Sequence, residues 1–257
     1  MRQLIPRASR DAEPDLAAVY AYPGHATRWT RANMVAAADG AAQADGRSGG
    51  LSGTADKRVM GVLRALADVI LVGASTIRVE GYDRPPSARP QFAAQRAEAG
   101  QREVASYAVV SASLELDFES PRYTEAKVPT ITITVADAPT DRLAAARKAG
   151  EVIVAGEGRV DLPFALDALA ETGRGRLLCE GGPHLLAAIT RAGYLDELCL
   201  TLAPQLRAGD AMRILAGVEL DPPVPMTLHA LLVEEGFLFA RYLTAPEPGP
   251  ASENGDD

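Results

Sequence analysis

The chain has 257 residues, with 34 acidic and 26 basic side chains and a formal net charge of −8 at pH 7. Its hydrophobic content of 47% and charged content of 23% are ordinary for a globular protein in water. The acidic balance argues against binding to nucleic acid or to anionic membranes, because those partners need basic faces.

The cysteines, the hydropathy and the histidines further narrow the kinds of protein that this chain can be. Cys179 and Cys199 are too few for a disulfide framework, so we expect a reducing, cytoplasmic location. No apolar run reaches about 18 residues, so no membrane span is expected. His25, His184 and His229 lack metal-ligand spacing, so we predict no metal site.

The two ends of the chain differ in composition from its body. Residues 1–28 are polar and mixed, and we interpret them as an N-terminal arm with one short helix over 15–20. Residues 246–257 carry four acids and no base, and their low hydrophobicity predicts a disordered acidic tail. No linker interrupts residues 29–245, which we predict to form one domain.

Strand-like and helix-like patterns alternate through this domain. The apolar run 68–73 ends in glycine, which is typical of a parallel strand buried on both faces. Strands are predicted at 30–37, 68–73, 106–111, 129–136, 151–155, 176–180 and 197–203, followed by an antiparallel hairpin of 226–234 and 237–243. Helices are predicted at 54–67, 74–80, 91–101, 140–149, 163–172 and 183–192. This order predicts an α/β fold: a mainly parallel mixed sheet with helices on both faces and a C-terminal antiparallel hairpin.

Two strand-to-helix junctions are rich in glycine. One contains Gly73, and the other contains Gly181 and Gly182 followed by Pro183. Helix starts beyond the carboxyl ends of parallel strands donate backbone N–H groups to anions such as phosphate. The alternative is that these glycines only permit tight turns. The chain has neither a G-x-G-x-x-G after its first predicted strand nor a P-loop, which disfavours a standard dinucleotide fingerprint and a P-loop kinase.

A third glycine-containing loop, with Gly156 and Gly158, also follows a predicted strand. It could admit a ligand, or it could simply lead into a helix capped by Asp161.

Three carboxylates follow strands or begin helices. Asp39 and Glu180 follow strands, where they could bind a polar substrate or relay a proton, and Asp56 lies in the first turn of a helix. The structural alternatives are a turn for Asp39 and complementation of the helix dipole for Asp56.

Three ordered motifs resemble a known family. Residues 33–40 resemble N-x-A-x-S-x-D-G, residues 52–76 resemble S-G-x-x-D … L-R-A-x-x-D-A-I-L-V-G-A-x-T, and residues 180–204 resemble E-G-G-x-x-L … A-G-L-V-D-E-L … A-P. These motifs are those of the riboflavin-biosynthesis pyrimidine reductases, which comprise the reductase half of the bifunctional deaminase–reductase and its stand-alone relatives.

The resemblance implies a dihydrofolate-reductase-like fold, NADPH as the hydride donor, and usually a homodimer. The implied substrate is a ribosylaminopyrimidine 5′-phosphate whose ribosyl group is reduced to ribityl at C1′. By position in the motifs, Gly73, Thr76, Gly181 and Gly182 are candidate cofactor-binding residues. The resemblance also implies that the loop with Gly156, Gly158 and Val160 lies beside the cofactor and that Ser111 is a candidate for its adenosine side. The candidate substrate-binding residues are Asn33, Asp56, Lys57 and Arg58, with Lys57 and Arg58 as alternatives for the phosphate. The candidate catalytic residues are Asp39 and Glu180.

The chain departs from the family pattern in two places. Ala37 replaces the serine of S-x-D-G, which removes one hydroxyl near the substrate. Residues 1–28 are too few to form the deaminase half, so we expect this chain to lack it. The sequence therefore leaves two possible pyrimidine substrates, the deaminated and the undeaminated form. A reductase of dihydrofolate or another pterin and a non-catalytic NADPH-binding protein remain the alternative functions.

Overall fold

The structure is a computed structural model that describes residues 1–6 and 13–244. The strands are β1 (Arg2–Ile5), β2 (Trp29–Ala37), β3 (Val69–Gly73), β4 (Ser106–Val110), β5 (Ile131–Thr134), β6 (Glu151–Val154), β7 (Arg176–Cys179), β8 (Glu197–Ala203), β9 (Thr227–Glu234) and β10 (Phe237–Leu243). The helices are α1 (Leu16–Val19), α2 (Thr54–Leu66), α3 (Ala74–Glu80), α4 (Ala93–Glu98), α5 (Pro121–Thr124), α6 (Thr140–Ala149), α7 (Leu162–Glu171) and α8 (Pro183–Arg191), with a 3₁₀ turn at Pro90–Phe92.

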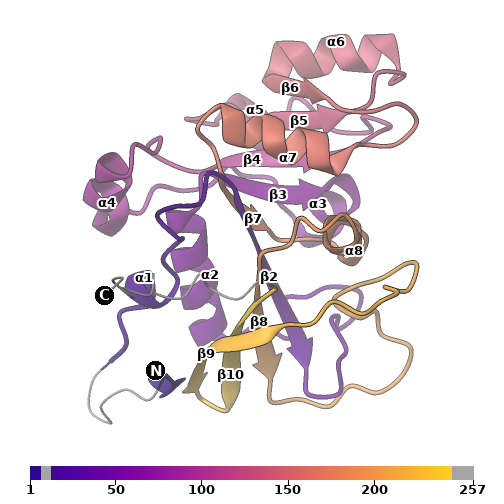
Figure 1. The fold of residues 1–257 in the computed structure, drawn as a ribbon. Coiled ribbons are helices and arrows are strands. Elements are labelled where there is room, and N and C mark those ends of the chain that lie inside the picture. The colour runs from indigo at the N-terminus through magenta and orange to yellow at the C-terminus, as the bar shows by residue number, and fades with distance from the viewer. Residues whose placement is uncertain (7–12, 245–257) are drawn as a thin grey trace, which may run out of the picture.

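The described strands form one mixed sheet in the order β1-β9-β10-β8-β2-β7-β3-β4-β5-β6 (Figure 1). From β8 to β6 all neighbours are parallel, whereas β10, β9 and β1 pair antiparallel at one end. The predicted α/β class, with a mainly parallel sheet and a C-terminal hairpin, is confirmed.

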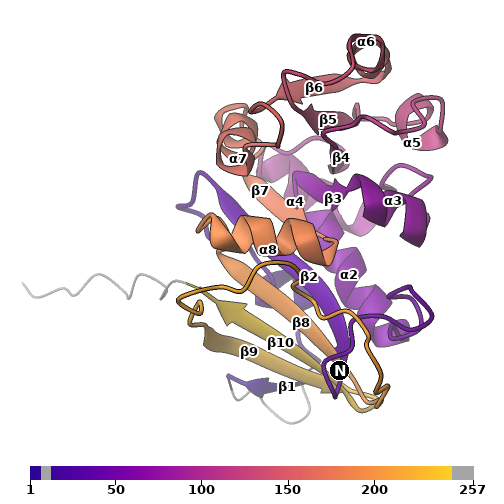
Figure 2. The ribbon, with the colours of Figure 1, turned by 90° about the vertical axis from the view of Figure 1, so that its right-hand side faces the viewer.

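Helices cover both faces of the sheet, and each face has its own hydrophobic core. In β3, Ile70 and Val72 pack into the core beneath α2, whereas Val69 and Leu71 pack into the core beneath α7 and α8. Figures 1 and 2 show α2 and α8 on opposite sides of the strands. The apolar run of β3 therefore has the burial on both faces that the sequence predicted.

The N-terminal segment is more integrated than the predicted arm. Its first residues form β1, which pairs with β9 and places a strand at the edge of the sheet. Tyr20, just after α1, is 1% exposed and lies in the core. The four residues of β1, two polar followed by two apolar, are too few to give a periodic pattern, so the sequence alone did not reveal this strand. The predicted acidic tail, 246–257, lies outside the described residues.

A buried ion cluster joins this segment to the sheet. Glu197 of β8 accepts hydrogen bonds from Arg31 Nε at 2.7 Å and from Arg241 Nε at 2.8 Å. Arg241 Nη1 also donates to the carbonyl of Val19 at 3.0 Å, and Tyr22 stacks on the Arg31 guanidinium. Burial alone would raise the pKa of Glu197, but the two guanidinium groups lower it to about 2. The carboxylate is therefore held in its charged form inside the protein.

Candidate active site

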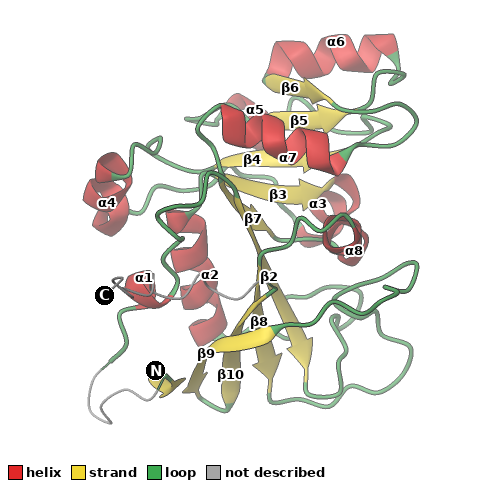
Figure 3. Ribbon diagram, viewed as in Figure 1, coloured by secondary structure: helices red, strands yellow, loops and turns green. Residues whose placement is uncertain are grey.

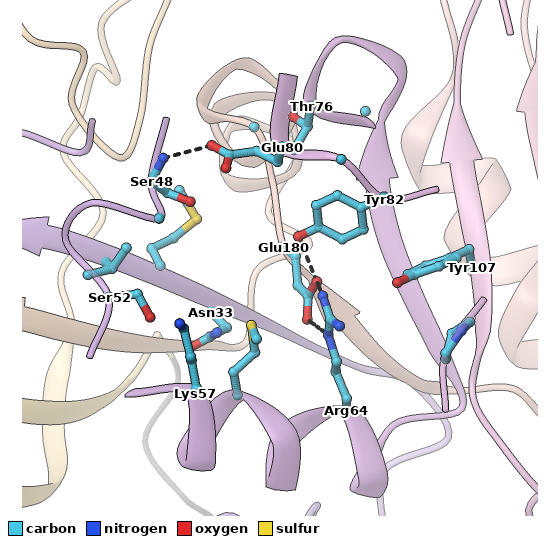
Figure 4. A pocket seen from close by; sticks show the side chains of 18 of the residues that line it. Asn33, Ser48, Ser52, Lys57, Arg64, Thr76, Glu80, Tyr82, Tyr107 and Glu180 are labelled. Atoms are coloured by element: carbon cyan, nitrogen blue, oxygen red, sulfur yellow. Dashed lines mark hydrogen bonds and ion pairs between the residues drawn. The ribbon is translucent and has the colours of Figure 1, made fainter. Parts of the chain in front are cut away.

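A cavity of about 920 Å³ opens where the carboxyl ends of β2, β3 and β7 meet α2 and the starts of α3 and α8. This is where open α/β sheets bind their ligands, because strand ends and helix N-termini converge there. Two long loops, 38–53 and 204–226, lie beyond the ends of β2 and β8 and contribute to its rim (Figure 3). The side chains inside it come from segments far apart in the sequence (Figure 4).

Helix α2 presents a polar stripe to the cavity. Asp56, Met60 and Arg64 are spaced four residues apart, so they lie on one side of the helix, with Lys57 beside them. The opposite side of α2 carries Val59, Val62, Leu63 and Leu66 into the core. The amphipathic pattern that folds this helix onto the sheet also aims its charged groups at the cavity.

Glu180, directly after β7, is the centre of the polar contacts. Its two carboxylate oxygens accept hydrogen bonds from Arg64 Nε and Nη2, each at 2.7 Å, and Tyr82 donates its hydroxyl proton at 2.8 Å. The Glu180 side chain is 3% exposed. Burial alone would lower the pKa of Arg64, but Glu180 raises it, so the guanidinium stays charged. This bidentate geometry fixes the carboxylate in one orientation.

Two tyrosines extend this cluster. Burial and the charge of Glu180 raise the pKa of Tyr82 well above its ordinary value. Its ring meets that of Tyr107 edge to face at 5.7 Å, and burial raises the pKa of Tyr107 to about 12. Both phenols therefore remain protonated donors at neutral pH.

A second carboxylate stands at the other end of the polar stripe. Asp56 is 6% exposed, and its Oδ2 accepts a short hydrogen bond from the Ser52 hydroxyl. This leaves Oδ1 as an acceptor beside Asn33 of β2 and Lys57, which line the same part of the cavity. The arrangement can bind a ligand that presents N–H donors on one side and an anionic group on the other.

The two glycine junctions meet at the cavity. Gly73 donates its N–H to the carbonyl of Gly181 at 2.8 Å, and a cis peptide joins Gly181 to Gly182. A Cβ at position 182 would lie 2.8 Å from Thr76 Oγ1, so any larger residue there would force a local shift. Helices α3 and α8 begin here, and no described side chain caps either of them. Their first N–H groups are left for an anionic ligand.

Thus Asn33, Asp56, Lys57, Gly73, Thr76, Glu180 and Gly182 line the cavity, with Gly181 hydrogen-bonded beside them.

Two predicted site residues lie elsewhere. Asp39 is exposed in the turn after β2, where it accepts backbone N–H groups from Arg207 and Ala208, each at 2.7 Å. Arg58 points away from the cavity and forms an ion pair with Glu234, because it lies on the outer side of α2. Of the two candidate bases only Lys57 lines the cavity, and Asp39 does not line it either.

The remaining predicted cofactor residues lie further along the same sheet edge. Ser111 follows β4, and its Oγ accepts the N–H of Leu114 at 3.0 Å. Gly156, Gly158 and Val160 follow β6, outside the residues that line the cavity. All of these residues lie just after strands, and their role in binding the cofactor stays a prediction.

Several lining residues were not predicted from the sequence. Arg64, Tyr82, Glu80 and Ser48 hold the cavity in shape, and Glu80 Oε1 accepts the Ser48 N–H at 2.8 Å. The available signal was the spacing of Asp56, Met60 and Arg64, each four residues after the one before. Tyr82 and Glu80 gave none, because their partners are distant in sequence.

Residues 1–6 and 13–244 offer neither a metal-ligand cluster nor a membrane-spanning helix. No group of three or more His, Cys, Asp or Glu side chains there could hold a metal ion. None of the helices in this part of the chain is long and apolar enough to span a membrane.

The chain is similar to known proteins in both sequence and fold. Residues 28–230 match the model of the RibD C-terminal domain. The chain belongs to the RibD C-terminal domain family. A curated relative from Methanothermobacter thermautotrophicus, named 2,5-diamino-6-ribosylamino-4(3H)-pyrimidinone 5′-phosphate reductase, is 31% identical over 172 residues, covering 66% of this chain and 76% of the relative. A relative of the same name from Aquifex aeolicus is 31% identical over 171 residues, covering 66% and 71%.

Solved structures of RibD-type proteins share the fold. A pyrimidine reductase-like protein from Corynebacterium diphtheriae superposes with a TM-score of 0.77 at 27% identity, covering 89% of this chain and 97% of that one. RibD from Acinetobacter baumannii superposes with a TM-score of 0.64 at 14% identity, covering 84% and 58%, which shows the fold alone. The resemblance inferred from the three sequence motifs is confirmed.

Proposed function

We propose that the chain is an NADPH-dependent reductase of 2,5-diamino-6-ribosylamino-4(3H)-pyrimidinone 5′-phosphate that converts the ribosyl group to ribityl in riboflavin biosynthesis. The observation that carries this proposal is the meeting of the two glycine junctions with the carboxylates Asp56 and Glu180 in one cavity. The names of the curated relatives support the substrate.

The glycine junctions fit a dinucleotide phosphate. The Thr76 hydroxyl lies against Gly182, and the uncapped first turn of α8 offers backbone N–H groups to a pyrophosphate. When bound, NADPH supplies the hydride that reduces C1′ of the sugar in its ring-opened imine form. Ser111 and the loop with Gly156, Gly158 and Val160 would hold the adenosine end. The protein's main contribution is to orient donor and acceptor.

Two buried carboxylates in the cavity, Asp56 and Glu180, suit the undeaminated pyrimidine. Amino groups on the base are hydrogen-bond donors, and Asp56 Oδ1 together with the remaining lone pairs of Glu180 can accept them. Replacing a base amino group by a carbonyl would bring two acceptors together, which is unfavourable. Asn33 would bind the same substrate, and Lys57 would bind its phosphate.

Steady-state kinetics test this function. NADPH oxidation is measured with the diaminopyrimidinone phosphate, its deaminated analogue and dihydrofolate, and the product is identified by mass spectrometry. We expect the diamino substrate to give the highest kcat/KM and a product heavier by two hydrogen atoms. Turnover of dihydrofolate alone would instead identify a pterin reductase. NADPH binding without any oxidation would identify a non-catalytic binding protein.

We further propose that the enzyme is a cytoplasmic homodimer. Both cysteines are free, which suits a reducing compartment. Leu206 and Val218, on the loop after β8, are 81% and 74% exposed, and an apolar loop of this kind is typical of a protein contact. Sedimentation equilibrium is expected to give twice the mass of one chain, and a monomer at micromolar concentration would contradict the dimer.

A further inference from the structure

Two loops that are distant in sequence run side by side at the rim of the cavity. The first, residues 38–53, follows β2, and the second, residues 204–213, follows β8; we call the second the strap. The N–H of Ala38 donates to the carbonyl of Gln205 at 2.9 Å, and the N–H of Ala42 donates to the carbonyl of Met212 at 2.7 Å. Ala42 and Met212 both line the cavity, so the fit between loop and strap shapes its wall.

Asp39 lies between these two backbone contacts. Its Oδ2 accepts the N–H groups of both Arg207 and Ala208, each at 2.7 Å, and Oδ1 lies 3.4 Å from the N–H of Ala41. The N–H groups of Ala208 and Arg207 lower the pKa of Asp39, so the side chain is a carboxylate at neutral pH. Ala208 has φ +55°, an unfavourable conformation that the bond to Asp39 helps to hold.

The strap is in turn hydrogen-bonded to the first loop. The side chains of Gln205 and Arg207 both reach the carbonyl of Gly50 at 3.4 Å. Two residues before Gly50, the N–H of Ser48 donates to Glu80 of α3. The cavity wall from Ser48 to Met212 is thus connected through a strap that Asp39 anchors.

We propose that Asp39 is a positioning residue for the reductase reaction: it fixes the strap so that the loop at 42–49 keeps the shape that binds substrate. This inference rests on the proposed function for its kinetic effect. A catalytic acid would need to reach the reacting atoms, whereas Asp39 is exposed and outside the lining of the cavity. The geometry assigns it to binding rather than to proton transfer.

Two substitutions separate these roles. Asp39→Ala removes the acceptor, and we expect KM for the pyrimidine substrate to rise about tenfold while kcat changes less than about twofold. Asp39→Asn keeps one oxygen that can accept both N–H groups, so KM is expected to stay within about threefold of that of the wild type. If both variants lowered kcat a hundredfold or more, Asp39 would be a proton-transfer residue and the inference would be overturned.

Hydrogen exchange of the substrate-free protein tests the anchor independently of activity. The amides of Arg207 and Ala208 are expected to exchange at least about tenfold faster in Asp39→Ala than in the wild type. Asp117→Ala is the matched control, because exposed Asp117 accepts the N–H of Glu119 at 3.0 Å in a loop away from the cavity. Unchanged exchange in the strap would overturn the inference. Faster exchange in a protein without reductase activity would reject only the proposed function.

Discussion

Glu180 carries more of the candidate site than any other single residue, because three donor groups converge on its buried carboxylate. Arg64 comes from α2 and Tyr82 from the loop after α3, so Glu180 connects three segments of the chain. The sequence placed Glu180 after a strand and thereby predicted that it would reach the cavity. It did not reveal Arg64 as its partner, because that contact spans 116 residues and depends on the packing of α2 on the sheet.

Glu180→Gln is expected to lower kcat/KM for the pyrimidine substrate by about a hundredfold, measured by NADPH oxidation. The amide turns an N–H₂ group toward the Arg64 guanidinium and leaves a charge without its counter-ion. Unfolding in urea should show a loss of about 2–3 kcal/mol, since Arg64 keeps 27% of its side chain exposed to water.

Glu151→Gln is the matched control for this prediction. Glu151 also pairs with arginines, at 2.6 Å to Arg174 and 3.3 Å to Arg102, but its side chain is 35% exposed. Exposed pairs contribute about 0–1 kcal/mol, so activity and stability should change little. Equal effects of the two substitutions would show that Glu180 has no special role.

At the scale of elements, the start of α8 carries the proposed cofactor site. Gly182 precedes Pro183 and lies so close to Thr76 of α3 that the two helix starts form one surface. The hydrophobic patterns predicted both helices and their preceding strands closely. The hydrophobic pattern of a segment reflects how that one element is buried, so the apolar run of β3 also predicted its burial on both faces. The pattern could not reveal β1, because β1 forms a strand only by pairing with β9.

Gly182→Ala is expected to weaken NADPH binding about tenfold or more, measured by calorimetry. The added Cβ would lie 2.8 Å from Thr76 Oγ1, and the shift that relieves this contact separates the two helix starts. Gly24→Ala is the control, because a Cβ at Gly24 meets no atom within 4 Å. NADPH affinity equal to that of the wild type in Gly182→Ala would contradict the assigned cofactor position.

At the scale of the whole molecule, the Arg31, Glu197 and Arg241 cluster links the first segment of the chain to β8 and β10. We predict that this cluster makes the free energy of unfolding fall as the pH is lowered. The pKa of Glu197 falls from an ordinary 4.5 to about 2 on folding, so its contribution is complete above pH 4.5 and is lost as the pH falls toward 2.

Urea unfolding between pH 5 and pH 3 measures this dependence, and the wild type should lose about 2 kcal/mol from this group. Glu197→Gln is expected to be less stable at pH 7, because two buried guanidinium groups lose their counter-ion. Its stability should also fall less over the same pH range. Parallel losses in the two proteins would assign the acid sensitivity to other groups.

Cofactor binding should also be visible in the stability of the whole chain, because a ligand that binds only the folded state stabilises it by mass action. At about 100 times its Kd, NADPH adds about 2.7 kcal/mol, which for a chain of this size raises Tm by about 5–10 °C. NADH at the same concentration should raise Tm less, since it lacks the additional phosphate for which the proposed site is selective. Gly182→Ala should show a smaller shift with NADPH at that concentration, whereas Gly24→Ala should match the wild type. Equal shifts with NADH and NADPH would reject the proposed selectivity, and no shift with either would reject the assignment of the glycine junctions to a nicotinamide cofactor.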